Sequence, residues 1–463
     1  MTVSTRTPGQ KLLFAILIAA FLAIPLFTVY LLVYDRQSQS ETAQTSIAEG
    51  WGGPQTIGGP LLVIPYQEQV VETVQEGGRA VSRTNLVWRE LSLSPERADI
   101  RSDLRPERRR RSIYEAVVYE ATASGEARFA LPADLARFGV TADRLAYERA
   151  ELRFGLSDAR GLFGPPPTVQ VDGRALALQP GKGLAATGGS GFFAWLDAGA
   201  IRERPLGVSF RFAFRGNGHL TLSPQAGDTR WTVTSRWPHP SFQGGFLPTS
   251  REVGDGGFTA TWRVGNLALG RALVSSGEAT SATSGDMSMA RGPAPQPAGA
   301  YEARVDLVTP VDLYSQVDRS VKYGFLFIGF TFMAFLLFDV VAGVRVAAAE
   351  YLLVGAGLVL FFVMLLAFAE VIGFTAAYLV AAAAIIALIA AYSAAVLGSR
   401  RRGGYIAALL AGLYAVLYIL LSLEAYSLLI GSLLLFAALA SIMYLTRKLD
   451  WAGVRTGPPT ETE

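Results

Sequence analysis

The sequence predicts an integral membrane protein in which six transmembrane α-helices form a bundle and a large, predominantly β domain lies outside the membrane. Three observations support this fold class. Of the 463 residues, 51% are hydrophobic and only 17% are charged. The hydrophobic residues are concentrated in one early run and in the last third of the chain, in stretches long enough to cross a hydrocarbon core of about 30 Å. The region between them shows short apolar runs separated by Gly and Pro, which favour strands.

The first element is the apolar run from Leu12 to Tyr34, which predicts a transmembrane helix. Arg6 and Lys11 precede it, and Asp35 follows it. A cleaved signal peptide has an apolar segment of about 7 to 15 residues, whereas this run continues for 23. We therefore interpret residues 1–34 as a cytoplasmic tail followed by an uncleaved signal anchor.

Residues 35–322 are predicted to form the β-rich domain. Apolar side chains alternate at Phe210, Phe212 and Phe214, as expected where one face of a strand is buried. The pattern fits a β-sandwich-like fold, either as one large sandwich or as two lobes that meet at the Gly/Pro-rich stretch 161–191. Ser275 to Ala300 is predicted to be a loop. The clearest predicted strands are Leu61–Tyr66, Val87–Leu93, Ile113–Ala121, Val208–Phe214, Trp231–Ser235 and Phe258–Val264.

Residues 323–446 contain five further apolar stretches and predict a five-helix bundle, followed by a tail at 447–463. Arg345, Arg400 to Arg402 and Arg447 fall on the same side as the basic residues of the N-terminus, whereas the two intervening hairpin tips carry none. The positive-inside rule then predicts cytoplasmic termini and a periplasmic domain. The predicted spans are 323–343, 351–369, 374–397, 404–422 and 426–446.

Composition excludes several classes of function. The chain has no Cys and only two His, which argues against thiol nucleophiles, disulfides and zinc sites, and we predict no cofactor and no metal. The region 35–322 carries 32 basic and 31 acidic residues, so no basic face for nucleic acid is predicted. His219 and His239 lie outside any hydrolase motif, and His239 is interpreted as a turn residue between two prolines. We therefore predict that the protein is not an enzyme.

Several short motifs, in the same order along the chain, carry a resemblance to a known family. The first is the pair Trp51–Gln55 and Gly59–Tyr66, which follows a single N-terminal helix. With the other matching segments it resembles the CreD family of inner-membrane proteins. Those segments are Ser157–Leu162, His239–Phe242, Gly245–Pro248, Phe258–Trp262, Pro310–Tyr314, Arg319–Ile328, Tyr351–Gly355, Ile372–Phe374, Ala377–Leu379, Gly431–Ser432 and Asp450–Trp451.

The resemblance implies a multi-pass inner-membrane protein that is associated with cell-envelope integrity and with the stress regulon of a two-component system. It implies no established reaction. The chain departs from the family pattern at Ser315, at Val371 and at Ala425. At Val371 a His is expected after Glu370, and its absence argues against a proton relay there.

The strongest local charge feature is the run Arg108, Arg109, Arg110 and Arg111. Guanidinium groups bind phosphate in a bidentate manner, so this run is a candidate patch for anionic lipid headgroups, lipopolysaccharide phosphates or an acidic partner. The alternative is a solvated edge that is balanced by nearby acidic residues.

A second candidate site consists of charges near the membrane surface. Glu370 and Glu424 occupy the tips of two short hairpins, and Arg319 and Lys322 lie where the domain is expected to enter the bundle. Placing a charged side chain at membrane depth is energetically unfavourable, so such residues usually have a structural or functional role. We predict that the four residues form a salt-bridged collar at the junction of domain and bundle, with an ion or substrate gate as the alternative.

Two functions lead at this point, and a third class, a membrane-bound hydrolase or transferase, would require several carboxylates to converge in one cleft of the domain. The first is a non-enzymatic envelope-integrity protein that binds a protein, lipid or glycan through its domain while the helices contact membrane lipid. The second is a transporter or lipid-handling protein in which the Phe-rich helix 323–343 lines a path, on the expectation that its rings face lipid or a loose groove. The Ala-rich helix 374–397 is predicted to be the central packing helix. The sequence leaves the oligomeric state open.

Overall fold

The computed structural model describes residues 8–76, 79–112, 114–277, 301–308, 313–341, 347–396, 398–422 and 427–447. The chain divides into two compact units. One consists of Met1–Thr42 with Val311–Glu463 and is called the membrane unit here; the other, Ala43–Pro310, is called the β unit. The limits of the β unit lie inside the predicted 35–322, because helical residues continue into this range at both of its ends.

Helix α1 runs from Pro8 to Glu49 and is 15 residues longer at its C-terminal end than the predicted span. The physical reason is that residues 35–49 contain no Gly or Pro, and their Gln, Glu and Ala residues favour a helix. Side-chain hydrogen bonds one turn apart, from Gln37 to Glu41 and from Gln39 to Asp35, support this polar segment. The helix ends where Gly50 begins a Gly- and Pro-rich turn.

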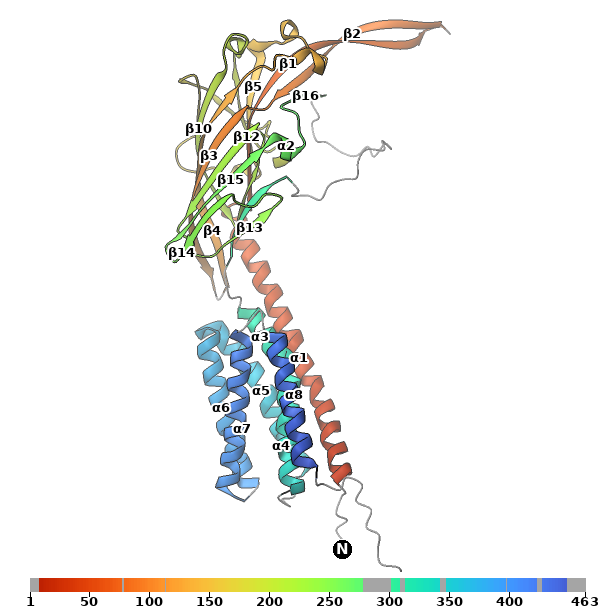
Figure 1. Ribbon diagram of the computed structural model, residues 1–463, viewed down its shortest axis with the longest axis vertical. Helices are drawn as coiled ribbons and strands as arrows, with labels where there is room; N and C mark the ends of the chain where they lie inside the picture. Colours follow the sequence, from red (N-terminus) through yellow and green to blue (C-terminus); the bar gives the residue numbers. More distant parts are fainter. Residues whose placement is uncertain are drawn as a thin grey trace, which may run out of the picture. The chain divides into compact units, whose positions relative to one another are not determined.

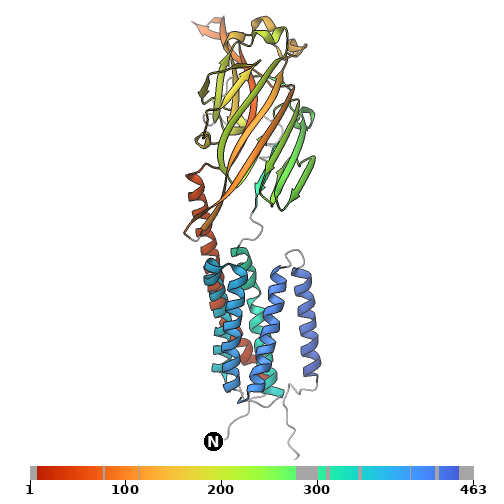
Figure 2. The same ribbon diagram turned by 90° about the vertical axis from the view of Figure 1, so that its left-hand side faces the viewer.

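The remaining helices of the membrane unit follow one another with short connections. Helix α3 is amphipathic and was missed by the sequence interpretation; it buries Tyr314, Val317 and Val321 on one face. The long helices run alongside one another (Figures 1 and 2). Their bounds are α3 (Leu313–Lys322), α4 (Gly324–Val341), α5 (Ala348–Ile372), α6 (Phe374–Val396), α7 (Arg400–Ser422) and α8 (Ser427–Thr446).

Five helical segments of the described chain are long and apolar enough to cross a membrane. They are Leu12–Ile47, Leu313–Leu336, Ala348–Ile372, Phe374–Val396 and Arg400–Leu421. Together with the β-rich unit they confirm the predicted class, a helical membrane protein with a large β domain.

Two expectations about helix packing were wrong. Helix α5, and not the Ala-rich α6, has the largest buried share, because α3, α4 and α6 all pack on it. The phenylalanines of α4 do not face outward as a group: Phe327, Phe332 and Phe335 are buried, and among those whose side chains the structure describes only Phe325 is strongly exposed. Large rings fill the space beside small residues of the neighbouring helix, as where Phe332 lies against Gly355.

The β unit contains two sheets. The nine-stranded sheet has the order β13-β17-β11-β1-β5-β9-β8, with β2 paired to β1 and β16 to β2. Its strands are β1 (Gln55–Glu76), β2 (Arg79–Leu93), β5 (Ala150–Leu156), β8 (Leu178–Pro180), β9 (Gly191–Leu196), β11 (His219–Ser223), β13 (Pro240–Gly244), β16 (Val274–Gly277) and β17 (Ala303–Leu307).

The eight-stranded sheet has the order β14-β15-β12-β3-β4-β10-β6-β7. Its pairs are antiparallel except for β12 with β3. Short 3₁₀ turns and the single-turn helix α2 (Asn266–Leu269) connect strands of the unit. The strands are β3 (Arg97–Arg111), β4 (Tyr114–Phe129), β6 (Thr168–Val171), β7 (Arg174–Ala175), β10 (Leu206–Asn217), β12 (Asp228–Ser235), β14 (Ser250–Gly254) and β15 (Gly257–Gly265).

Both sheets contribute to one hydrophobic core. In β10 every second residue is buried, including Phe210, Phe212 and Phe214, as their alternation predicts. Trp231 of β12 and Trp262 of β15 lie with their rings 4.7 Å apart in the same core. Each of the six strands predicted from the sequence lies within a longer strand of the structure, apart from Ile113, which is outside the described residues.

The predicted seam at 161–191 does not separate two lobes. This stretch supplies β6 and β7 to one sheet and β8 to the other, within a single compact unit. Of the predicted loop 275–300, residues 275–277 belong to β16, and 278–300 lie outside the described residues.

Candidate functional site

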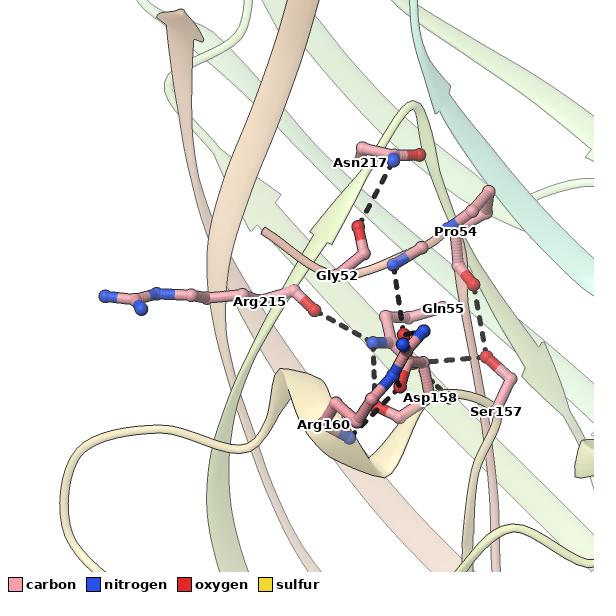
Figure 3. A network of polar contacts seen from close by, with 9 residues as sticks. Gly52, Pro54, Gln55, Ser157, Asp158, Arg160, Arg215 and Asn217 are labelled. Carbon is pink, nitrogen blue, oxygen red and sulfur yellow. Dashed lines mark hydrogen bonds and ion pairs between the residues drawn. The ribbon is translucent and has the colours of Figure 1, made fainter. Parts of the chain in front are cut away.

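The turn that follows α1 is held by a buried polar network centred on Gln55 (Figure 3). The Gln55 side chain has no exposed surface, and both amide hydrogens are donated to backbone carbonyls, to Asp158 at 3.1 Å and to Arg215 at 2.9 Å. Its Oε1 accepts from the Asp158 amide at 3.1 Å and faces the Ser157 hydroxyl at the same distance. A fully paired buried amide fixes three chain segments in one arrangement.

Trp51 lies in this turn with a guanidinium group on its ring from each of two strands. The Cζ atom of Arg109 on β3 is 3.6 Å from the ring centre, and that of Arg215 on β10 is 4.0 Å away. The indole N–H donates to the carbonyl oxygen of Tyr119 at 3.3 Å. Arg215 also contacts Glu120 at 3.1 Å. Cation–π contacts of this kind stabilise partly buried sites by about 0.5 to 2 kcal/mol each.

The motifs Trp51–Gln55 and Ser157–Leu162 meet at this site, and their backbones pack so closely on other chain segments that glycine is required at two positions. Gly161 leaves room for the Arg215 carbonyl oxygen, which would be 2.6 Å from an added Cβ. Gly52 has φ +127°, a conformation that side chains disfavour. A cavity of about 120 Å³ remains beside Trp51, between Asp158, Arg160 and Arg215.

Asp158 carries the negative charge of the cavity. A bidentate contact from the Arg160 side chain, at 2.9 Å to each carboxylate oxygen, lowers the pKa of Asp158, despite the opposing effect of burial. Its Oδ2 also accepts from the Gly53 amide at 3.4 Å. The carboxylate thus fastens the motif Ser157–Leu162 to the turn after α1.

The predicted arginine patch forms the end of β3 and is directly connected to this network. Arg109 lies on Trp51, Arg111 donates to the Ser46 hydroxyl of α1 at 3.0 Å, and Arg108 lies over Trp237 at 5.5 Å. We call Arg108 to Arg111 the arginine end of β3. Its acidic neighbours, which the alternative interpretation invoked, also make contacts: Glu107 is 3.5 Å from Arg109, and Glu115 is 3.1 Å from Arg110.

The predicted collar residues are in the membrane unit, and Glu424 lies outside the described residues. Glu370 accepts from the Tyr314 hydroxyl at 3.2 Å, and its basic neighbour is Arg36 of α1, at 4.0 Å. This differs from the predicted pairing with Arg319 or Lys322, because α1 remains helical past its apolar run and brings Arg36 to this depth. The collar as a junction between domain and bundle stays a prediction.

The two basic collar residues make local contacts on α3. Lys322 pairs with Asp318 at 2.6 Å, one helical turn away. The Nε of Arg319 donates to the carbonyl oxygen of Ser315 at 3.3 Å.

Neither histidine side chain joins the Gln55 network in the described chain, although the His219 carbonyl oxygen accepts from the Tyr119 hydroxyl at 2.8 Å. His219 is partly buried 3.9 Å from Asp306, and its pKa is lowered by burial and by the nearby Arg304. The carbonyl oxygen of His239 accepts from the Val308 amide at 3.3 Å. Sequence reasoning missed Gln55 and Tyr119 as site residues. Gln55 could have been found, because Trp51–Gln55 and Ser157–Leu162 are both motif segments; Tyr119 lies in neither of them.

The comparisons with known proteins agree with these motifs. The family model described as "Inner membrane protein CreD" matches residues 7–452. The chain is 32% identical over 436 residues to the inner membrane protein CreD of Escherichia coli (strain K12), which covers 93% of this chain and 90% of that protein. The match includes both units and the motifs of the Gln55 network. The chain is therefore a multi-pass inner-membrane protein that belongs to the CreD family.

Proposed function

We propose that the chain crosses the inner membrane six times, with both termini in the cytoplasm and the β unit, a sandwich of two sheets, in the periplasm. Helix α8 is the sixth span, since its 20 residues reach about 30 Å at 1.5 Å per residue. The basic residues support the orientation: Arg400 to Arg402 begin α7 and Arg447 follows α8, on the side of the N-terminus.

Single cysteines test this topology cleanly, because the chain has none of its own. We expect Ser275→Cys, on the exposed strand β16, to react with an impermeant maleimide in intact spheroplasts. Ser399→Cys, between α6 and α7, should react only after lysis. Equal labelling of both positions in intact spheroplasts would contradict the orientation.

We further propose that the protein contributes to envelope integrity as a binding protein and not as an enzyme, with the arginine end of β3 as the surface that takes an anionic protein, lipid or glycan partner. The observation that carries this is the support given to the arginines. Arg109 is fixed on Trp51 and Arg111 on Ser46, while the Arg110 side chain remains 66% exposed. A partner would therefore meet guanidinium groups that are already positioned, which reduces the entropy lost on binding.

The experiment is complementation of cells that lack the protein. We expect the triple variant Arg108→Ala, Arg110→Ala and Arg111→Ala to reach the membrane in normal amounts and yet to leave the cells sensitive to detergent. The matched control removes three exposed arginines elsewhere in the β unit, Arg137, Arg144 and Arg174, and should restore resistance.

Full complementation by the first triple variant would refute the assignment. A failure of both triple variants, with normal amounts of protein, would show that total charge and not the arginine end matters.

A further inference from the structure

The last residues of α1 form a helical segment with little packing of its own. Ala43–Glu49 belongs to the β unit, although the same helix, from Leu12 to Ile47, is long and apolar enough to cross a membrane. From Glu41 to Ile47 none of the described side chains is buried. A short helical stretch is marginally stable in water unless other parts of the chain hold it. The order of Ala43–Glu49 therefore depends on a few contacts near its end.

Two residues of the arginine end of β3 supply such contacts. Arg111 donates to the hydroxyl of Ser46, in the last turn of the helix, at 3.0 Å. The guanidinium group of Arg109 lies 3.6 Å from the ring centre of Trp51, two residues beyond the end of the helix. The surface that we propose for an anionic partner is thus also a support for the end of α1.

Both arginines are able to hold an anion without releasing α1. A guanidinium group has five N–H donors, all in one plane. Arg109 presents the face of this plane to Trp51, and Arg111 uses one of its donors on Ser46, so that donors remain on both groups. Arg111 is exposed and has no acidic partner among the described residues. Bidentate pairing with phosphate or carboxylate oxygens restricts the motion of such a group.

Arg108 belongs to the same run but contacts a different segment. Its guanidinium group lies 5.5 Å from the ring centre of Trp237, whose indole N–H donates to the carbonyl oxygen of Val308 at 2.9 Å. Arg108 makes no hydrogen bond or ion pair with α1 in the described part of the chain. Removing Arg108 or Arg111 therefore takes the same charge from an anionic partner, whereas only the loss of Arg111 also removes a contact with α1.

We propose that an anionic partner on the arginine end of β3 stabilises the end of α1, so that binding in the β unit changes the order of a helix that also runs through the membrane unit. This inference rests on the proposed function, because it requires an anion at the arginine end. The coupling is reciprocal: a partner that fixes Arg109 and Arg111 favours the ordered helix end, and the ordered helix end presents the two guanidinium groups to the partner.

The test is hydrogen exchange of the full chain in detergent, with and without inositol hexakisphosphate. This soluble probe presents several phosphate groups at once, and its binding is measured separately by calorimetry. We expect the amides of Ala43–Glu49 to exchange about fivefold more slowly when the probe is bound, because the helix end then opens less often. Amides of β15, which has no contact with the arginine end among the described residues, are the internal control and should exchange at an unchanged rate.

Single variants separate binding from coupling. Arg108→Ala and Arg111→Ala should each weaken binding of the probe, because each removes one guanidinium group. At a probe concentration that saturates both variants, Arg108→Ala should keep the slower exchange of Ala43–Glu49, whereas Arg111→Ala should lose a large part of it. Ser46→Ala keeps every arginine and should also lose part of it. Ser38→Ala, the same change two turns earlier on α1, should behave like the wild type.

The outcomes distinguish this inference from the function on which it rests. Unchanged exchange of Ala43–Glu49 in the saturated wild type would overturn the coupling and leave the binding surface in place. Faster exchange would show that the anion draws the arginines away from the helix end, and would also overturn it. Equal slowing in Arg108→Ala and Arg111→Ala would exclude the contact between β3 and α1 as the route. Failure of the wild type to bind the probe would refute the binding surface and the coupling together.

Discussion

Replacing Gln55 with Ala is the sharpest test of the network that holds the turn after α1. The Gln55 amide is fully buried and makes three hydrogen bonds to backbone groups, while its oxygen also faces the Ser157 hydroxyl. Each such bond contributes about 1 kcal/mol net, and leaving buried partners unpaired adds about 1 to 3 kcal/mol. Since the three bonds share one side chain, we expect a loss of about 4 kcal/mol in the free energy of unfolding of the β unit.

The assay is urea unfolding of the full chain in detergent, followed by tryptophan fluorescence. Six of the seven Trp residues lie in the β unit, so the signal reports on this unit. With a urea dependence of about 2 to 3 kcal/mol per M, the midpoint should fall by about 1 to 2 M. Gln67→Ala, at an exposed position of the same strand, should shift it by less than about 0.2 M. A Gln55→Ala midpoint equal to that of the control would refute the reasoning.

Three further predictions follow from the same contacts. The lowered pKa of Asp158 means that its charge stabilises the fold above the unfolded value of about 3.9 and that this contribution is lost as the pH falls through the folded value. The urea midpoint of Asp158→Asn should therefore lie below that of the wild type at pH 7, and the difference should shrink as the pH falls below about 3.9, while the exposed control Asp255→Asn should run parallel to the wild type. Gly161→Ala should destabilise the β unit by about 2 kcal/mol in the same assay, because its Cβ meets backbone that cannot move easily. Glu370→Gln should lower the stability of the helices by only about 1 kcal/mol, measured by circular dichroism on heating, because its partner Arg36 is 41% exposed and 4.0 Å away; a loss above about 3 kcal/mol would indicate a desolvated pair.

The parts of the fold that were predictable are those with a strong local period. The alternation around Phe210 and the long apolar runs both place elements correctly. Strand β3 was missed although Ala98, Ile100, Ser102 and Leu104 alternate with charged residues, because two of its four inward residues are small and give a weak apolar signal. The length of α1 could have been inferred from the lack of any helix breaker before Gly50.

The candidate site was predictable only in part, for reasons of distance along the chain. The arginine run is visible in the sequence, but its contact with Trp51 joins residues on different elements. The two carbonyl groups that Gln55 binds are 103 and 160 residues away. A backbone carbonyl can accept a hydrogen bond whatever the side chain of its residue is. These contacts therefore leave no pattern of residue types in the sequence.

Strand β1 has two parts with different pairing, and the outer part, which forms a long hairpin with β2, should lose its hydrogen bonds independently of the inner part. Between Ile57 and Val63, β1 pairs with β5 on one edge, and on the other edge it pairs with β11 up to Gly58 and with β2 from Leu62. Beyond Tyr66 it pairs only with β2 in the described chain, and the ribbon extends past the other strands of the β unit (Figure 1). A two-stranded ribbon is marginally stable by itself. Its amide protons from Gln67 outward should exchange with solvent by local fraying, whereas those before Val63 require opening of the core. The boundary between fast and slow exchange should therefore fall inside β1, with no change of secondary structure to mark it.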